Sequence, residues 1–465
     1  MPIPRWIFLS LVLIFVATSS QAAPRPNIVF IMADDLGYGH LGSYGQTEIN
    51  TPHLDRMAEE GMRFTQSYSG AALCAAARSI LMTGYHGGHT PVRGNSGGIA
   101  LRDEDVTVAE VLKTAGYRTG LFGKWGLGDA DTTGVPNKQG FDEFFGYLHQ
   151  RHAHSYHTDY LWHNEERYPF PENWNGARKT YVHDTIMEKA LEFIEADEAQ
   201  PFYCFISVAI PHHEWVAPEE SVAPYLGKFP EERPEETWRQ GYYTPEAPKA
   251  TMAGMISHMD QGVGQVLDAL KAKGLAENTL VIFTSDNGAD RYPIANADFF
   301  NANGGLRGYK YDQYEGGIRV PTIAHWPGML KPGTENHMPF HFMDYLPTFA
   351  ALAGADAAVP TDVDGLSLAA TLTGKDDTDL KRDRFLYWED QGGQRSGRLG
   401  RWKAVQRSPK SPLELYDLQV DLAETTNVAT SHPDIVAKLY ALLDASHSEA
   451  PPQIEPGAPK GRHYR

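Results

Sequence analysis

The feature that most constrains the fold is an alternation of short apolar, β-branched runs with longer amphipathic segments. The strand-like runs lie at residues 28–32, 118–122, 202–209 and 279–284. Helical spacing is found at residues 107–115, 182–196 and 252–273. Strands that alternate with helices pair mostly in parallel, with the helices covering the sheet. The pattern predicts an α/β fold with a large mixed, mostly parallel sheet flanked by helices.

The last part of the chain has a different pattern. A charged, turn-rich stretch near residues 376–384 is followed by short strand-like runs and then a helix, at residues 385–388, 402–406, 413–418 and 432–446. We therefore predict a main domain over residues 24–380 and a small α+β C-terminal subdomain over residues 381–465. The Pro-rich end from Pro451 is expected to fray.

The N-terminal residues 1–23 have the layout of a secretory signal peptide. A positive charge at Arg5 precedes an apolar run at 6–16, and small residues follow, with a cleavage site at Ser20-Gln21-Ala22. The alternative is a membrane anchor, but the run is shorter than the roughly 20 residues that a span needs. We expect a secreted or periplasmic mature chain without a membrane span.

Charge and cysteine content exclude several classes of protein. The formal net charge of −18 argues against a nucleic acid or an anionic membrane as partner. The chain has only two cysteines, so it is not a disulfide scaffold. Cys204 lies in an apolar run and is expected to be a buried strand residue. Cys74 needs a separate explanation.

Acidic residues follow two of the predicted strands. Asp34 and Asp35 come directly after one strand, and Asp286 and Asn287 follow another. Ligands of open α/β sheets bind at the carboxyl ends of strands, where these oxygens can meet. An all-oxygen ligand set suits calcium or magnesium. The alternative is a pair of turns, although adjacent carboxylates repel unless positive charge lies between them.

Cys74 opens an Ala-rich segment that predicts a helix ending before Gly84. The N–H groups at such a helix start attract an anion, and Arg78 lies one turn further on. From the residues alone, Cys74 is either the low-pKa thiolate of a cysteine hydrolase or a packing residue.

The segment from Cys74 to Gly84 resembles the signature C-x-[PA]-[SA]-R-x-x-L-x-T-G of the formylglycine-dependent sulfatases. These are the type I, arylsulfatase-like members of the alkaline-phosphatase superfamily. Further segments resemble the same family in the same order: residues 27–37, 116–128, 211–212, 285–288, 306–327, 415–418 and 424–427. The resemblance implies that residues 24–380 form the catalytic domain of a sulfuric ester hydrolase.

The resemblance also implies the site residues. A formylglycine-generating maturation enzyme would oxidise Cys74 during export. Calcium, with magnesium as the weaker alternative, would be bound by the modified Cys74 and by Asp34, Asp35, Asp286 and Asn287. By the same resemblance, Arg78 would hold the formylglycine hydrate, and Lys124 and Lys310 would bind the sulfate. His212 would lie beside the leaving oxygen.

Two positions depart from the family pattern. Ala76 replaces a common proline, which bears on the maturation system that recognises Cys74. Gly126 stands where the family often has a histidine. We hypothesise that His152 or His154 reaches the sulfate pocket in its place. The alternative is that both histidines belong to a polar surface loop.

The segment 149–174 suggests the substrate class. It mixes aromatic rings with polar groups, a combination that suits the faces and hydroxyls of sugars. We expect a sulfated mono- or oligosaccharide, contacted by Trp162 together with those histidines, and we expect aryl sulfates to be poor surrogates. Two other functions stay open at this point: a phosphatase or phosphonate hydrolase of the same superfamily, and a non-catalytic protein that binds sulfated glycans.

Overall fold

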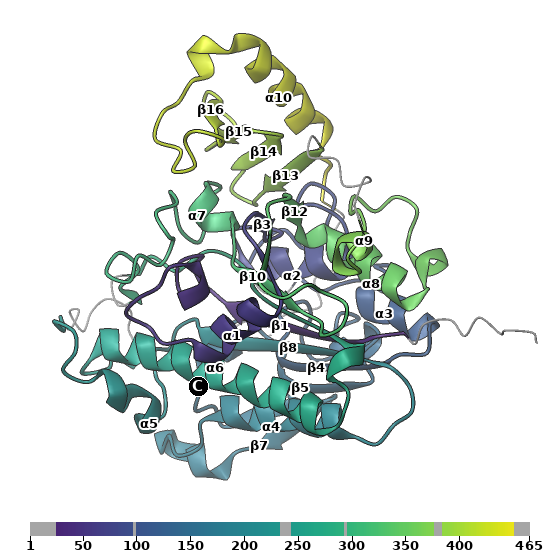
Figure 1. Ribbon diagram of the computed structural model, residues 1–465, viewed down its shortest axis with the longest axis vertical. Helices are drawn as coiled ribbons and strands as arrows, with labels where there is room; N and C mark the ends of the chain where they lie inside the picture. Colours follow the sequence, from purple (N-terminus) through teal and green to yellow (C-terminus); the bar gives the residue numbers. More distant parts are fainter. Residues whose placement is uncertain (1–24, 96–98, 233–242, 293–294, 376–383, 451–465) are drawn as a thin grey trace, which may run out of the picture.

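The computed structural model describes residues 25–95, 99–232, 243–292, 295–375 and 384–450 (Figure 1). Its main feature is a ten-stranded sheet in the order β11-β2-β10-β9-β1-β8-β4-β5-β6-β7. The five central strands, from β9 to β5, run parallel to one another, and antiparallel pairings lie on either side. The predicted mixed, mostly parallel sheet is therefore confirmed.

The central strands are long and buried: β9 (Thr279–Ser285), β1 (Asn27–Asp34), β8 (Phe202–Pro211), β4 (Arg118–Lys124) and β5 (Glu143–Tyr147). The flanking strands are shorter: β11 (Thr334–Asn336), β2 (Met62–Phe64), β10 (Thr322–His325), β6 (Tyr160–His163) and β7 (Glu166–Pro169). A separate short pair joins β3 (Ser67–Tyr68) and β12 (Phe340–His341).

Helices cover both faces of the sheet (Figure 1). On one face lie α2 (Cys74–Thr83), α3 (Val108–Thr114) and α8 (Tyr345–Ala353), and on the other lie α1 (Pro52–Glu60), α4 (Val182–Glu195) and α6 (Pro248–Ala272). The same part of the chain also contains three short helices: α5 (Glu219–Val222), α7 (Glu315–Ile318) and α9 (Ala369–Leu372).

Strand β1 shows how the sheet divides the core. Its side chains alternate, so Ile28 and Phe30 face the α2 side while Val29 and Ile31 face the α6 side. All four are fully buried, as expected of a central parallel strand covered on both faces. This burial fixes the register of β1 and therefore the place where its carboxyl end emerges.

The C-terminal part forms its own antiparallel sheet. It contains β13 (Phe385–Glu389), β14 (Arg395–Leu399), β15 (Trp402–Gln406) and β16 (Glu414–Asp417), covered by α10 (Pro433–Ala445) (Figure 1). The predicted α+β composition is confirmed. Strand β14 escaped the sequence analysis because its residues include two arginines and a glycine and form no apolar run.

A buried ion cluster joins this small sheet to the main one. Lys403 of β15 contacts Glu315 of α7 at 2.9 Å and Glu424 at 3.3 Å, and all three side chains are fully buried. These contacts fix the position of the small sheet against α7, because the loss of one partner would leave a buried charge unpaired. The predicted division at residues 380/381 lies outside the described residues and stays a prediction.

The predicted signal peptide and the Pro-rich end also fall outside the described residues. Among the helices that the structure describes, none combines the length and the hydrophobicity that crossing a bilayer would require.

Candidate active site

The two acidic clusters meet at the carboxyl edge of the central sheet. Strands β1 and β9 are parallel neighbours, with Ala33 opposite Ser285, and the Asp286 N–H donates to the carbonyl oxygen of Ala33 at 3.0 Å. Asp35 then leaves the strand direction with a φ of 66°. These features aim both sets of oxygens at one point.

The acidic side chains contact one another directly. The Asp35 N–H donates to Oδ1 of Asp286 at 3.2 Å, and Nδ2 of Asn287 donates to Oδ1 of Asp35 at 2.7 Å. Asp34, Asp35, Asp286 and Asn287 are all buried. Oδ1 of Asn287 is buried without a hydrogen-bond partner among the described residues. An acceptor of this kind calls for a ligand that donates or carries positive charge.

Three cationic side chains face the carboxylates. Nζ of Lys124, at the end of β4, is hydrogen-bonded to Oδ2 of Asp34. Nζ of Lys310 lies 2.7 Å from Oδ1 of Asp35. A guanidinium nitrogen of Arg78 lies 2.9 Å from Oδ2 of Asp286, and each of these cations is almost fully buried.

The carboxyl groups respond differently to this surrounding charge. Burial opposes ionisation of Asp34, but the attraction of Lys124 and Arg78 outweighs it and lowers the pKa of Asp34 to about 2. Burial raises the pKa of Asp35 to about 8 despite the attraction of Lys310. Burial also raises the pKa of Asp286. The side-chain cations therefore leave room for further positive charge between these carboxylates.

Cys74 opens helix α2 at this cluster, as its sequence predicts. Its Sγ lies 3.4 Å from Oδ1 of Asp34 and 3.8 Å from Oδ1 of Asp35. Burial raises the pKa of the Cys74 thiol, and the nearby carboxylates raise it further. An attacking thiolate needs the opposite shift, so the cysteine-hydrolase alternative is not supported.

Arg78 is held in place by residues of strands β4 and β8 as well as by Asp286. Its second guanidinium nitrogen donates to the carbonyl oxygen of Lys124 at 2.7 Å and to the hydroxyl of Ser207. The Ser207 hydroxyl in turn donates to the same carbonyl oxygen at 2.6 Å. The sequence analysis missed Ser207, because it stands inside the apolar run of β8 and looks like an ordinary strand residue.

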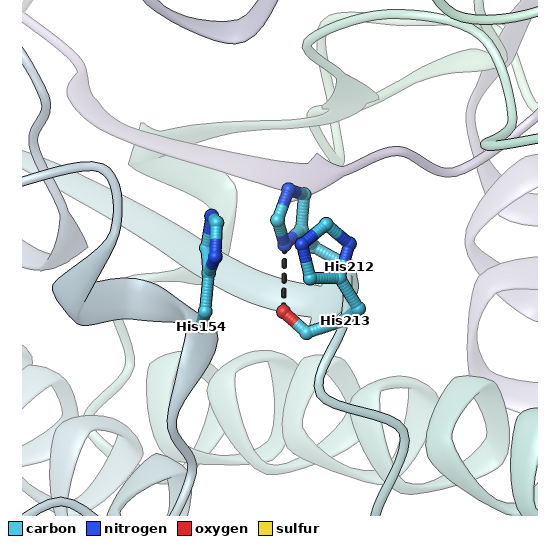
Figure 2. Close-up of side chains that lie close together, drawn as sticks. All are labelled: His154, His212 and His213. Carbon is cyan, nitrogen blue, oxygen red and sulfur yellow. Dashed lines mark hydrogen bonds between the residues drawn. The ribbon is translucent and has the colours of Figure 1, made fainter. Parts of the chain in front are cut away.

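Three histidines line the next part of the site (Figure 2). Nδ1 of His212 lies 2.7 Å from the carbonyl oxygen of His213, and Nε2 lies 3.6 Å from Oδ2 of Asp35. The Nδ1 contact requires a proton on Nδ1, so Nε2 faces the site with its lone pair. Burial and the neighbouring cationic groups lower the pKa of His212 well below its usual range, so the ring is neutral.

The structure brings His154 to this group but not His152. The His154 ring lies 4.6 Å from the His212 ring and 4.4 Å from the His213 ring (Figure 2). Nε2 of His152 instead lies 2.8 Å from the hydroxyl of Thr158, and its ring packs on Tyr147. The His213 ring lies 4.0 Å from the His212 ring, and its Nδ1 is 3.6 Å from Oδ2 of Asp290.

Trp162 lies on β6, outside this group of contacts. Its ring packs edge-on to Tyr160 and beneath the guanidinium of Arg167. The role predicted for Trp162 therefore stays a prediction.

Taken together, the fold and the site define a class of protein. An α/β sheet gathers three carboxylates, an amide oxygen, three cations and a helix-opening cysteine at its carboxyl edge. This arrangement is suited to hydrolysis of an anionic ester, because positive charge surrounds the place where charge develops.

The comparisons identify the family. The model of the sulfatase family matches residues 26–355, and the model described as N-sulphoglucosamine sulphohydrolase, C-terminal, matches residues 309–449. The chain is 31% identical to human arylsulfatase A, over 98% of this chain and 94% of that protein. The chain therefore belongs to the sulfatase family and is a sulfuric ester hydrolase, which confirms the resemblance.

Other relatives agree with this assignment. The chain is 29% identical to the N-acetylgalactosamine-6-O-sulfatase of Bacteroides thetaiotaomicron, over 92% of this chain and 94% of that protein. The crystal structure of Ps i-CgsB in complex with k-i-k-neocarrahexaose is 25% identical, with a TM-score of 0.75 over 93% of this chain and 95% of that one.

The fold alone would not have separated sulfatase from phosphonate hydrolase chemistry. The phosphonate monoester hydrolase of Agrobacterium radiobacter superposes with a TM-score of 0.65 at 20% identity, over 91% of this chain and 95% of that one. The family match decides for the sulfatase over that alternative and over a non-catalytic glycan-binding protein.

Proposed function

We propose that this enzyme hydrolyses a sulfate ester on a sulfated mono- or oligosaccharide, with Cys74 in its formylglycine form as nucleophile and with bound calcium. The observation that carries the proposal is the meeting of Cys74 with the acidic cluster and three cations in one buried site.

The ligand set fits a calcium ion. Asp34, Asp35, Asp286 and Asn287 offer carboxylate and amide oxygens, the ligands that a hard cation prefers. Oδ1 of Asn287 is buried and free to accept such an ion. The raised pKa values of Asp35 and Asp286 also favour a site that takes up positive charge. Bound calcium would supply positive charge that favours the ionised nucleophile and the transferred sulfate. Magnesium is the weaker alternative.

The side chains around the ligand set have separate tasks. Formylglycine hydrate would supply one hydroxyl to attack sulfur and a second to expel the sulfate. Arg78, fixed by Ser207 and by the Lys124 carbonyl, would orient those hydroxyls. Lys124 and Lys310 would bind sulfate oxygens, and their charge would stabilise the transition state more than the ground state.

His212 is placed to handle the proton of the leaving oxygen. Its ring is neutral and its Nε2 faces the site, so it can accept a proton there. A neutral ring protonated on Nδ1 has no proton on Nε2 to give. His212 must therefore take up a proton on Nε2 before it can protonate the leaving oxygen. His154, next to it, would contact the sugar.

The substrate class is supported by relatives. The similar Bacteroides protein is named for N-acetylgalactosamine 6-O-sulfate, and the similar Ps i-CgsB structure holds a neocarrahexaose. Export after removal of residues 1–23, to the periplasm or the medium, would place the enzyme where polysaccharide fragments occur. Because Cys74 must be oxidised to formylglycine, the proposal also includes a formylglycine-generating maturation enzyme as a partner.

The proposal is tested with protein made together with a formylglycine-generating enzyme. Mass spectrometry of the Cys74 peptide should show the loss of SH₂ and gain of O that conversion entails. The converted protein should release sulfate from members of a panel of sulfated sugars, and more slowly from an aryl sulfate. Converted protein that releases sulfate from no sugar would contradict the proposed substrate class.

The sugar-binding role of the segment 149–174 makes a separate prediction. We expect His154→Ala and Trp162→Ala to lower kcat/KM for the sulfated sugar about 10-fold more than for the aryl sulfate, because each removes a sugar contact. Tyr440→Ala is the control and should leave the ratio unchanged, since this partly exposed ring lies on α10, outside the segment. If neither variant changes the ratio between the two substrates, this segment is not the sugar site.

A further inference from the structure

Gly126 lies beside a side chain that fills its empty space. Its φ is +83°, and a Cβ built on it would lie 2.1 Å from Nε2 of Gln150. Gly126 comes two residues after Lys124, and its N–H donates to the Leu148 carbonyl oxygen at 2.9 Å. The Gln150 amide therefore occupies the place that a side chain at position 126 would take.

Nε2 of the Gln150 amide has no hydrogen-bond partner in the part of the chain that the structure describes. The residue is 7% exposed, and its Nε2 is buried without a hydrogen-bond partner among the described residues. A buried amide that makes no hydrogen bond is destabilising, so native chains seldom keep one unless something else satisfies it. Its Nε2 therefore points to a partner that the described residues do not supply, such as a bound ligand.

Gln150 lines a pocket beside the start of α2, the helix that Cys74 opens. Gln150 lines this pocket together with Gly126, Ala75 and Gly94. Ala75 directly follows Cys74 and belongs to the first turn of α2. The pocket therefore touches both the helix start that carries Cys74 and the chain segment that follows Lys124.

One side of the pocket is lined by polar side chains. Asp129 and His149 line it, with Nε2 of His149 3.9 Å from a carboxylate oxygen of Asp129. Burial lowers the pKa of His149 despite the attraction of Asp129, so the ring is neutral and can donate a hydrogen bond from only one of its nitrogens. Gln150 adds a neutral donor, which can bind an anion without a change of charge.

We propose that Gln150 is a substrate-binding residue whose Nε2–H donates to an oxygen of the sulfate ester. This inference rests on the proposed function, and it gives Gln150 the position that the missing histidine at Gly126 would have held. Sulfate oxygens only accept hydrogen bonds, so the amide N–H is the group that they select. His154 and Gln150 then serve different parts of the substrate.

The test uses Gln150→Met, which keeps the length of the side chain and removes the amide. We expect kcat/KM for sulfate release to fall about 10- to 100-fold, as for the loss of a hydrogen bond to a charged group. The Ki of inorganic sulfate as a competitive inhibitor should rise by a similar factor. The Tm should stay level or rise, because an unsatisfied buried amide is replaced by an apolar group.

Gln139→Met provides the matched control. Gln139 is also buried, but its Nε2 donates to the carbonyl oxygens of Arg102 and Thr133 at 3.2 and 3.0 Å. This variant should lower the Tm and leave the Ki of sulfate unchanged. Gly126→Ala is the second test, because its Cβ must displace the Gln150 amide and should also raise the Ki.

The outcomes separate the inference from the function on which it rests. An unchanged Ki in Gln150→Met overturns the inference, and so does a loss of activity accompanied only by a lower Tm. In either case, sulfate release by the wild type leaves the sulfatase proposal in place. Converted wild-type protein that releases no sulfate would remove the proposed function itself.

Discussion

Cys74→Ala is expected to abolish sulfate release, with a loss of at least about 10⁴-fold in kcat. In the proposed mechanism this side chain supplies the nucleophile, and its Sγ lies 3.4 Å from Oδ1 of Asp34 and 3.8 Å from Oδ1 of Asp35. The fold should survive, because alanine is well suited to the first turn of a helix. Sulfate release and the Tm are measured on the same preparation.

Cys204→Ala is the control for this variant. Cys204 is fully buried in β8, where its neighbours on either side are strand residues and not site residues. Its loss should lower the Tm through a small cavity while kcat stays close to that of the wild type. Turnover by pure Cys74→Ala protein within about 10-fold of the wild type would refute the proposed nucleophile.

The second large effect concerns the metal. Removal of calcium with a chelator, or the substitution Asp286→Asn, is expected to lower kcat about 10³-fold. Asp286 is fully buried and holds both the Asp35 N–H and the Arg78 guanidinium. The asparagine keeps the size and the acceptor oxygen but removes the charge, so it tests the ion more than the packing.

Binding gives a readout that does not depend on activity. Calcium should raise the Tm of the wild-type protein, because a ligand that binds the folded state stabilises it, and this rise should be lost in Asp286→Asn. Asp268→Asn, at an exposed position on α6, should keep the full rise. Restoration of the chelated wild type by zinc but not by calcium or magnesium would instead favour a site of the phosphatase kind.

Both predictions concern features that local sequence patterns could reveal. The acidic residues follow β1 and β9 directly, and parallel neighbours bring their carboxyl ends together whatever the details of packing. The start of α2 at Cys74 and its end before Gly84, which has a φ of +74°, likewise depend on neighbouring residues. The sheet and the acidic cluster could therefore be predicted from the sequence.

Other features needed the folded chain. The sequence shows that position 126 is a glycine and has no side chain. Only the folded chain shows that the Gln150 amide fills the space that a side chain there would occupy. The sequence does not distinguish His152 from His154, which are the same residue type in the same short segment. In the folded chain the His154 ring lies beside His212, whereas the His152 ring packs on Tyr147. Strand β14 forms because its neighbours pair with it, although its own residues form no apolar run.

The sequence by itself determined the fold class, the acidic strand ends and the helix that begins at Cys74, because each follows from the order of residues along a short stretch of chain. The tertiary structure decided which histidine joins the site, that Ser207 fixes Arg78, and that Gln150 fills the space beside Gly126. These contacts join segments far apart in the chain or depend on how a loop folds back on the sheet. Their geometry is set by packing, which the local pattern of residues does not encode.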